Sequence, residues 1–346
     1  MNRGDVPRWL WGDSPAAGLA RLPLIPLALV YGGAMRLRAA AYRRGWIATE
    51  RLPLPSVAIG NLSVGGVGKT PLAAWVAARY AAAGITPGVL LRGYGGDEPL
   101  VLARLVPEAV VIADPDRAMG ARRARAAGAG VLVLDDAFQH LAVARDLNVL
   151  VVSAESMEAP AWPLPAGPWR EGWEALERAD WVVITRRRAS AAAAAALGDR
   201  IGSRRPGLAL SIAELGLGGL EGLASGTTRP LTQVAGRRVV AAAGIGDPAS
   251  FAAQLAALGA SVQLMPYQDH HPYSAADVGA LLRAGARADY VVVTEKDAVK
   301  LRGRWPRDAS EPLVARVRVT WEHNGAPLER ALDAAGAREP IPRPSE

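Results

Sequence analysis

A glycine-rich loop ending in a lysine is the segment of this sequence best suited to chemistry. It follows an apolar run that predicts a strand and precedes a run that predicts a helix. In that context glycine N–H groups and the helix start hold phosphate oxygens, the lysine reaches the β- and γ-phosphates, and the hydroxyl ligates Mg²⁺. We expect ATP and Mg²⁺ to bind there, although Ser63 replaces the first glycine of the usual template. The loop residues are Gly65, Gly66, Val67, Gly68, Lys69 and Thr70.

Two adjacent carboxylates, Asp135 and Asp136, follow the apolar run Val131–Leu134. Ligands bind at the carboxyl ends of strands in open parallel sheets, and carboxylates are suitable Mg²⁺ ligands. Such a pair is also common in ordinary turns. With the phosphate loop upstream, we expect one carboxylate to hold Mg²⁺, directly or through water, and the other to orient water or substrate. Gln139 and His140 follow closely and are expected to line the same site.

A second glycine-rich segment, residues 92–99, contains Arg92, Asp97 and Glu98. Glycines beside charged residues at a strand end predict a mobile substrate loop. A hydroxyl that attacks the γ-phosphate needs a base, and Asp97 is the candidate because its flanking glycines permit close approach. Arg92, Glu98 and the more distant Arg117 are expected to contact substrate or phosphate. The alternative for this segment is an ordinary turn.

Two short polar runs near the C-terminus complete the candidate residues. Asp269–Tyr273 (DHHPY) contains two of the four histidines, and Thr294–Lys300 (TEKDAVK) contains two of the three lysines. In a chain with 40 Lys and Arg residues, lysine is rare enough that each one is expected to serve where a compact ammonium is needed. We interpret the two runs as a second half-site facing the nucleotide domain.

Composition excludes several classes of protein. The 346 residues are 50% hydrophobic and 21% charged, which is typical of a globular chain with a large core. With no cysteine and only four histidines, neither disulfides nor a thiolate zinc site is expected. Most of the net charge of +7 comes from residues 1–51, which contain eight arginines and three acidic residues. Charge concentrated in this way does not indicate a nucleic-acid partner.

The basic N-terminal region surrounds an uncharged segment, Leu22–Met35. Its 14 residues are fewer than the ~20 needed to span a bilayer, and Pro23 and Pro26 weaken a simple spanning helix. Tryptophans, tyrosines and arginines around it suit a lipid headgroup boundary. We expect contact with a membrane surface; the alternative is a helix docked on the protein's own core.

Alternating apolar runs and helical stretches predict an α/β fold, a P-loop NTPase-like parallel sheet flanked by helices, with a second, smaller α/β domain. The predicted strands begin near Pro55, at Gly88–Leu91, Ala109–Ala113, Val131–Leu134, Leu147–Val152 and Trp181–Thr185, and recur from Arg238. The predicted parts are a membrane-surface segment (1–52), a P-loop kinase domain (53–215), a glycine-rich linker (216–235), a C-terminal α/β domain (236–337) and a loose tail (338–346).

Taken together, these motifs resemble the tetraacyldisaccharide 4′-kinases, the lipid A disaccharide kinases of Gram-negative bacteria. The resemblance covers nearly the whole chain and includes the same loop without the first glycine. Ala137 and Trp169 stand where the family usually has glycine and leucine. The motifs that carry the resemblance are GNLSVGGVGKTP, RGYGGDEP, DDAFQH, LPAGPWRE, GIGDP, DHHPY and TEKDAVKL.

The resemblance implies transfer of the ATP γ-phosphate to the 4′-hydroxyl of a tetraacylated disaccharide 1-phosphate, forming lipid IVA at the inner face of the inner membrane. It implies Asp97 as base and His270 as the partner that orients it or raises its basicity. Lys69 and Thr70 would act on phosphates and Mg²⁺, with Asp135 and Asp136 as the acidic pair. Because His270 lies in the other predicted domain, we expect the domains to close before transfer. We expect a peripheral monomer.

Two other classes of protein share part of this pattern. A membrane-associated partitioning ATPase also combines a GGVGKT loop with a basic amphipathic segment, but such proteins carry a lysine before the glycine pair, where this chain has Val64. A soluble carboxylate-ligating or amine-activating P-loop enzyme would leave the N-terminal arginines and aromatics without a role.

Overall fold

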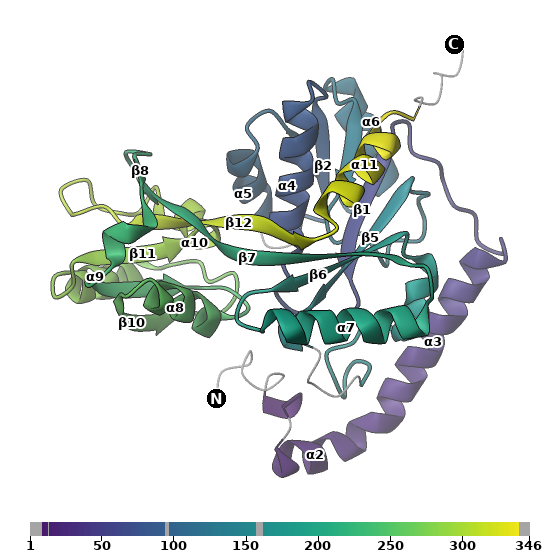
Figure 1. The fold of residues 1–346 in the computed structure, drawn as a ribbon, viewed down its shortest axis with the longest axis horizontal. Coiled ribbons are helices and arrows are strands. Elements are labelled where there is room, and N and C mark those ends of the chain that lie inside the picture. The colour runs from purple at the N-terminus through teal and green to yellow at the C-terminus, as the bar shows by residue number, and fades with distance from the viewer. Residues whose placement is uncertain (1–8, 13, 94–96, 157–161, 339–346) are drawn as a thin grey trace. The chain divides into compact units, whose positions relative to one another are not determined.

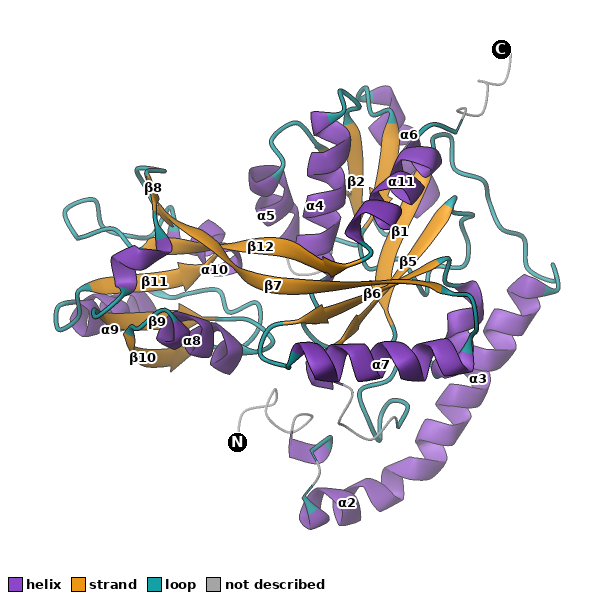
Figure 2. Ribbon diagram, in the orientation of Figure 1, coloured by secondary structure: helices purple, strands orange, loops and turns teal. Residues whose placement is uncertain are grey.

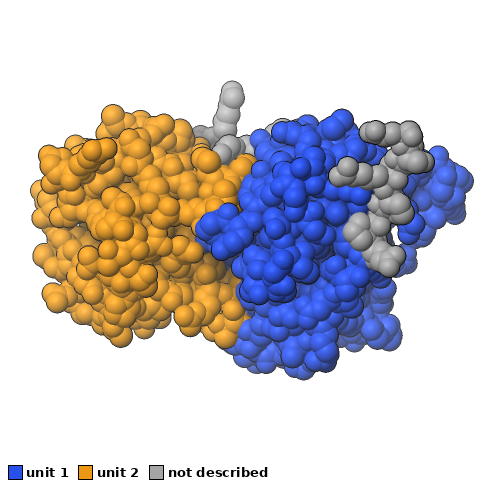
Figure 3. Space-filling model, turned by 90° about the horizontal axis from the view of Figure 1, so that it is seen from above, with its two compact units in different colours: residues 1–93, 105–213, 321–346 blue, residues 94–104, 214–320 orange. Residues whose placement is uncertain are grey.

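The computed structural model describes residues 9–12, 14–93, 97–156 and 162–338, which form two compact units (Figure 3). Of these residues, unit 1 contains 9–93, 105–213 and 321–338, and unit 2 contains 97–104 and 214–320. Tyr94, Gly95 and Gly96 of the RGYGGDEP run, most of the predicted tail and the first eight residues lie outside the described residues.

Unit 1 is built on a parallel sheet in which β1 is central (Figure 2). The strand order is β6-β5-β1-β4-β2-β3, with every neighbouring pair parallel, and β7 (Ala209–Gly222) lies next to β6. The strands are β1 (Ser56–Asn61), β2 (Pro87–Leu91), β3 (Val110–Ala113), β4 (Val131–Leu134), β5 (Leu147–Ser153) and β6 (Trp181–Arg186). The predicted P-loop NTPase-like parallel sheet is confirmed.

Helices of unit 1 cover this sheet because its central strands are apolar on both faces. All four residues of β4 and all six of β1 are buried. Alternate side chains of a strand point to opposite faces, so such strands need cover on both sides. The helices are α4 (Lys69–Ala82), α6 (Arg117–Ala126), α7 (Ala191–Arg204) and α11 (Gly325–Gly336), with the 3₁₀ turns η2 (Ala154–Ser156) and η3 (Trp173–Arg178).

Unit 2 contains its own parallel strands, in the order β10-β9-β11-β12 (Figure 1). They are β9 (Arg238–Ala243), β10 (Ser261–Pro266), β11 (Tyr290–Thr294) and β12 (Leu313–His323), and β8 (Thr228–Arg229) pairs antiparallel with β7. The helical segments are α5 (Glu98–Leu105), η4 (Leu231–Val234), α8 (Pro248–Ala257), α9 (Ala275–Gly285) and α10 (Glu295–Leu301). The prediction of a second α/β unit is therefore confirmed.

The segment predicted as a linker, residues 216–235, is mostly ordered secondary structure. Strand β7 continues to Gly222, and Leu220 and Val234 are buried in the core of unit 2. One of the glycines that indicated a linker, Gly218, serves close packing instead, because a Cβ on it would lie 2.9 Å from Cβ of Arg318. Composition alone does not distinguish a flexible glycine run from a strand that another backbone approaches.

The chain returns to unit 1 after β12, so the C-terminal domain does not extend to residue 337 as predicted. Helix α11 belongs to unit 1, and Tyr80 on α4 donates a hydrogen bond of 2.7 Å to the carbonyl of Leu332. Arg79 pairs with Asp333 at 2.7 Å, and the rings of Trp75 and Trp321 lie 5.0 Å apart. The amphipathic pattern of α11 did not reveal which unit its apolar face would cover.

The N-terminal region of unit 1 is helical from Pro15 to Arg43, through α2 (Pro15–Arg21), η1 (Leu22–Leu24) and α3 (Ile25–Arg43). The helix continues through Pro23 and Pro26, each of which lies in the first turn of its segment, where a missing N–H costs little. By length and composition, this is the one helix of the described residues able to cross a membrane. Its exposed apolar side chains include Leu19, Leu22, Leu27, Leu29, Val30 and Leu37.

Basic residues tie this helical segment to the rest of unit 1. Arg36 pairs with Glu174 at 2.7 Å, and Arg43 pairs with Glu177 at the same distance. Of the residues of α3, Ala28 is buried, and Leu27, Leu29, Val30 and Leu37 are exposed, whereas most of the other apolar side chains are half-buried. The helix therefore leaves several large aliphatic side chains uncovered, while arginines on it pair with acidic residues of unit 1.

Gly60 in β1 provides a test of this packing. A Cβ at this position would lie 2.6 Å from the backbone nitrogen of Phe138, which follows the two aspartates. We expect Gly60→Ala to lower the free energy of unfolding by about 1–3 kcal/mol, measured by denaturant titration. Gly202→Ala is the control because open space surrounds that helical glycine, and it should be neutral or stabilise by up to about 1 kcal/mol. Equal stability of Gly60→Ala and the unmodified chain would contradict the inferred contact.

Candidate active site

The loop between β1 and α4 has the backbone geometry of an anion site. Gly65 and Gly68 have φ of 129° and 93°, values that favour glycine. Lys69 is the first residue of α4, and among the described residues no side chain caps this helix start. The N–H groups and the positive dipole end of α4 are therefore directed at the loop. This is the arrangement expected for a phosphate-binding loop.

Residues at or just after the ends of β5 and β6 fix the phosphate loop through hydrogen bonds to its backbone. The Thr185 hydroxyl donates a 2.7 Å hydrogen bond to the carbonyl of Val67, and Arg187 donates one of 2.8 Å to the carbonyl of Gly66. Glu155 accepts from three consecutive backbone N–H groups, beginning with that of Arg187. Burial raises the pKa of Glu155, but these bonds and one from Ser153 lower it to about 2. The turn after β6 is thus fixed against the loop.

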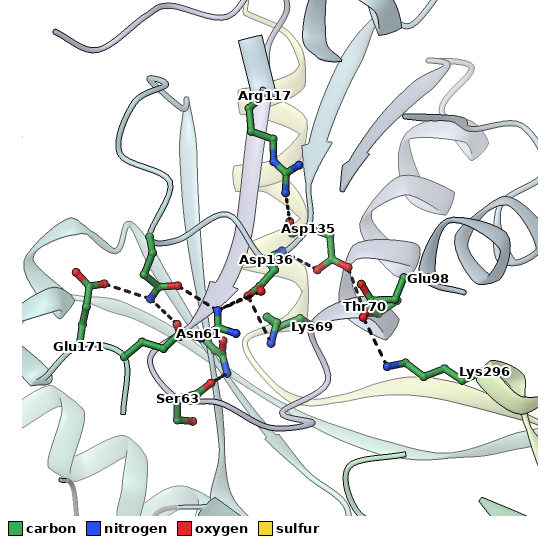
Figure 4. A network of polar contacts seen from close by, with 12 residues as sticks. Asn61, Ser63, Lys69, Thr70, Glu98, Arg117, Asp135, Asp136, Glu171 and Lys296 are labelled. Carbon is green, nitrogen blue, oxygen red and sulfur yellow. Dashed lines mark hydrogen bonds and ion pairs between the residues drawn. The ribbon is translucent and has the colours of Figure 1, made fainter. Parts of the chain in front are cut away.

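Strand pairing brings the loop and the two aspartates together (Figure 4). Because β4 lies beside β1, the turn after β4 meets the start of α4. The Thr70 hydroxyl donates to Oδ2 of Asp135 at 3.1 Å, and Lys69 Nζ lies 3.6 Å from Oδ1 of Asp136. Asp135 is 3% exposed, so its carboxylate is aimed into the protein rather than at bulk water.

Asp136 lies in a left-handed turn, with φ of 50°. Arg170 donates to its two carboxylate oxygens at 2.9 and 3.1 Å. Burial raises the pKa of Asp136, but the charges of Lys69 and Arg170 have the larger combined effect and bring this pKa below its ordinary value. The carboxylate therefore remains ionised. Ala137 is buried and donates its N–H to the carbonyl of Ile59 at 3.0 Å. The left-handed residue of this turn is the aspartate, so alanine is accommodated.

Gln139 bridges three segments of unit 1. Its Nε2 donates to the carbonyl of Asn61 at 2.7 Å and to Oε2 of Glu171 at 3.1 Å, and Arg170 donates to its Oε1 at 3.4 Å. Figure 4 labels Asn61 and Glu171 of this network in the same view as the two aspartates. The side chain that was expected to contact substrate is engaged in fixing Arg170 and Glu171 next to the loop.

Arg117 is not placed as an exposed phosphate contact. It is 2% exposed and donates to the carbonyls of Asp114 and Asp135, at 2.8 and 3.1 Å. Its observed role is to hold the end of β4.

His140 is half-buried, and burial together with nearby arginines, first among them Arg117, lowers its pKa to about 4. Its imidazole is therefore neutral near pH 7, while Arg92 is exposed just after β2.

A second cluster forms in unit 2 around Asp97. This carboxylate is 4% exposed; its Oδ1 lies 2.7 Å from Nδ1 of His270, and its Oδ2 lies 2.9 Å from Nζ of Lys300. Burial raises the pKa of Asp97, but hydrogen bonds to Lys300 and His270 lower it below its usual value. Beside it, Lys296 lies 3.6 Å from Glu98. The expected pairing of Asp97 with His270 is thus present.

Asp97 belongs to the same unit as His270, which corrects its assignment to the 53–215 domain. Residues 97–104 form part of unit 2, with α5 anchored through the ion pair of Arg104 and Glu221 at 2.5 Å. The pairing therefore forms within one unit and requires no domain closure. The sequence did not reveal this because the segment is inserted between two strands of unit 1.

Local contacts explain the conformation of the DHHPY turn. His270 and Tyr273 both have left-handed backbones, with φ of 62° and 52°. His271 Nε2 lies 2.9 Å from Oδ2 of Asp277, which also completes a capping box at the start of α9. Buried Asp297 accepts from the N–H of Gly244 at 3.1 Å. The second histidine of the motif therefore shapes the turn, while the first reaches Asp97.

Four residues in these networks had no assigned role in the sequence analysis. Arg170 lies within the LPAGPWRE run, and the rarity of lysine marked Lys300 without indicating its partner. Neither Thr185 nor Glu155 carried a sequence signal, because each acts through backbone groups that only the folded chain brings near.

Comparison with known proteins identifies the family. A family model described as tetraacyldisaccharide-1-P 4′-kinase (LpxK) matches residues 20–96 and 95–336. A tetraacyldisaccharide 4′-kinase of Anaeromyxobacter sp. (strain K) is 38% identical over 97% of this chain and 96% of its own length. The chain belongs to the tetraacyldisaccharide 4′-kinase family.

Two further members of the tetraacyldisaccharide 4′-kinase family are similar to this chain. The protein of Alkalilimnicola ehrlichii is 40% identical over 88% of this chain and 93% of its own length. The crystal structure of LpxK from Aquifex aeolicus in complex with ATP superposes with a TM-score of 0.71 at 26% identity, covering 91% of this chain and 99% of that one. The resemblance read from the motifs is confirmed, and the two other classes of P-loop protein are excluded.

Thr185 offers a test of how the loop is held. Thr185→Val keeps the shape of the side chain but leaves the carbonyl of Val67 without its 2.7 Å hydrogen bond. We expect the KM for ATP to rise about 2- to 10-fold, which matches the net worth of one hydrogen bond. Thr49→Val, which removes a 3.3 Å bond to the carbonyl of Leu141, is the matched control. The same KM for both variants would show that Thr185 does not position the loop.

Proposed function

We propose that this protein transfers the γ-phosphate of ATP to the 4′-hydroxyl of a tetraacyldisaccharide 1-phosphate, forming lipid IVA in lipid A biosynthesis. Membership in the tetraacyldisaccharide 4′-kinase family over nearly the whole chain is the observation that carries this proposal. The phosphate loop, its lysine and the adjacent aspartates supply the chemistry that a phosphotransferase needs. Phosphoryl transfer depends mainly on positioning and on charge stabilisation, for which these groups are suited.

ATP binds at the loop of residues 65–70. Backbone N–H groups of the loop and the N-terminus of α4 hold phosphate oxygens, and Lys69 contacts the β- and γ-phosphates. Arg170, fixed by Gln139, keeps Asp136 paired with a cation when Lys69 engages the nucleotide. The charge of the Asp136 carboxylate is thus balanced both before and after the nucleotide binds.

The residues of unit 1 fit a Mg²⁺ ion. Thr70 and Asp135 present hydroxyl and carboxylate oxygens 3.1 Å apart, with Asp136 in the same turn, and hard oxygen ligands are those that Mg²⁺ takes. Among the described residues no group of three His, Cys, Asp or Glu side chains could hold a metal alone. Such a site is expected to be completed by substrate phosphates and water. Mg²⁺ would supply charge neutralisation on the transferred phosphate.

The pair Asp97 and His270 receives the proton of the attacking hydroxyl, with Asp97 as the base and His270 orienting it. Its contacts with Lys300 and His270 keep Asp97 ionised and therefore able to accept a proton. A base with a lowered pKa is adequate here. In the loose transition state of phosphoryl transfer the bond to the attacking oxygen is barely formed, so the hydroxyl needs little deprotonation before it attacks. Arg92 and Glu98 lie on either side of Asp97 in the sequence, and they are proposed to contact the acceptor substrate.

The helix Pro15–Arg43 is proposed to place the protein at the cytoplasmic face of the inner membrane. Its exposed leucines and valine suit acyl chains, and flanking arginines suit anionic headgroups. The acceptor lipid can then remain partly in the bilayer while its sugar reaches the site. We propose that the protein acts as a monomer. Its proposed partners are the acceptor lipid and the membrane surface, and it is not expected to bind nucleic acid.

The transfer reaction itself is tested with γ-labelled ATP, Mg²⁺ and tetraacyldisaccharide 1-phosphate in detergent. We expect label on the lipid, and Lys69→Met should reduce its rate of appearance at least about 100-fold, the scale of losing one transition-state donor. Arg122→Met, which breaks an exposed pair with Glu50, is the control and should retain full transfer. Release of free phosphate without lipid labelling would refute the proposed activity.

The catalytic pair is tested by comparing chemistry with nucleotide binding. Asp97→Asn and His270→Ala should each lower kcat at least about 100-fold, the lower range for general-base catalysis, while the dissociation constant for ATP stays nearly unchanged. His323→Ala, which removes an exposed histidine of β12, is the control. An unaltered kcat in either variant would remove that residue from the mechanism.

A further inference from the structure

The two oxygens of the Asp97 carboxylate are bound by groups from two different elements of unit 2. Oδ1 lies 2.7 Å from Nδ1 of His270, in the turn after β10, and Oδ2 lies 2.9 Å from Nζ of Lys300, near the end of α10. The side chains of Asp97 and Lys300 are 3% and 11% exposed, against 35% for His270. The ammonium is thus the buried partner of a buried carboxylate.

The other charged groups around this cluster are engaged with one another. Lys296, one turn before Lys300 on α10, lies 3.6 Å from Oε1 of Glu98 and 4.0 Å from Oδ1 of Asp269. Asp269 also lies 3.8 Å from Nε2 of His270. The two lysines of α10 therefore serve different acids, and Lys300 is the one paired with Asp97.

Lysine at this position has a chemical reason in a chain where only three of 40 Lys and Arg residues are lysine. An ammonium is a compact charge that can bind a single carboxylate oxygen. A guanidinium tends to bind both oxygens of a carboxylate as a fork, and it would compete with His270 for Oδ1. Lys300 therefore satisfies the charge of Asp97 and leaves the histidine contact intact.

We propose that Lys300 is a positioning residue for phosphoryl transfer, which holds Oδ2 of Asp97 so that a buried, ionised carboxylate keeps its contact with His270. This proposal rests on the proposed role of the pair Asp97 and His270. Lys300 acts through Asp97 and is not assigned a contact with substrate.

The sign of the pH effect follows from the contacts. Burial raises the pKa of Asp97, and the hydrogen bonds and charges of Lys300 and His270 lower it below its ordinary value. Without Lys300, burial is opposed by His270 alone, so the pKa rises and the carboxylate is protonated at a higher pH. Because the ionised form is the competent one, activity at the acid end of the profile is lost first.

The test is the pH dependence of kcat/KM for the lipid acceptor, measured on the full chain with Lys300→Met. We expect the acid limb to move upward by about one pH unit or more, the scale for removing a neighbouring opposite charge. At a pH below both the original and the new limb, this corresponds to a loss of at least about 10-fold in kcat/KM, which shrinks as the pH is raised. A loss of the same size at every pH, or no change, would overturn the proposal.

Lys300→Arg separates charge from shape and remains informative if the methionine variant does not fold. The guanidinium retains the positive charge, so the acid limb should stay at its original position, while competition for Oδ1 lowers kcat at all pH values. An acid limb that moves upward in this variant would overturn the proposal, because the charge beside Asp97 is preserved.

Two further variants make the outcomes distinguishable. Asp97→Asn, measured in parallel, tests the proposed function: full activity would refute the catalytic pair itself. Loss of activity in Asp97→Asn together with an unmoved limb in Lys300→Met would refute only the role of Lys300. Arg79→Met breaks ion pairs of 2.7 and 2.9 Å in unit 1 and controls for lost stability; its profile should keep the original acid limb.

Discussion

The parallel pairing of β1 with β4 is the constraint on which the nucleotide site depends. It places the turn containing Asp135 and Asp136 directly beside the loop that precedes α4. The absence of a side chain at Gly60 allows Phe138 to approach β1, and both strands are buried along their whole length. A shift of either strand would separate the lysine and hydroxyl of the loop from the two carboxylates.

Charge balance at buried carboxylates governs the second cluster in the same way. Placing Asp97 inside unit 2 is unfavourable unless cations and hydrogen-bond donors surround it. Lys300 and His270 supply them from α10 and from a turn whose left-handed residues are held by His271 and Asp277. The same contacts that offset the cost of burial also keep the carboxylate of Asp97 ionised, as its proposed role as base requires.

The N-terminal helix follows a different principle. Six of its large aliphatic side chains remain exposed, and its contacts with the rest of unit 1 include polar ones, such as that between Arg36 and Glu174. Exposing such apolar side chains to water costs free energy, whereas contact with a lipid surface removes most of that cost. The proposed contact with a membrane surface would cover these side chains.

Local sequence was sufficient for the parts of this protein that depend on residue order alone. The strand, loop and helix around Lys69 follow from apolar runs and glycine positions, and the family follows from motifs in the same order. Pairing across large separations was a different matter: the assignment of Asp97 to unit 2, the return of α11 to unit 1 and the partner of Lys300 were not predicted. Backbone propensities act over a few residues, but burial and charge pairing act between segments whose proximity exists only in the folded chain.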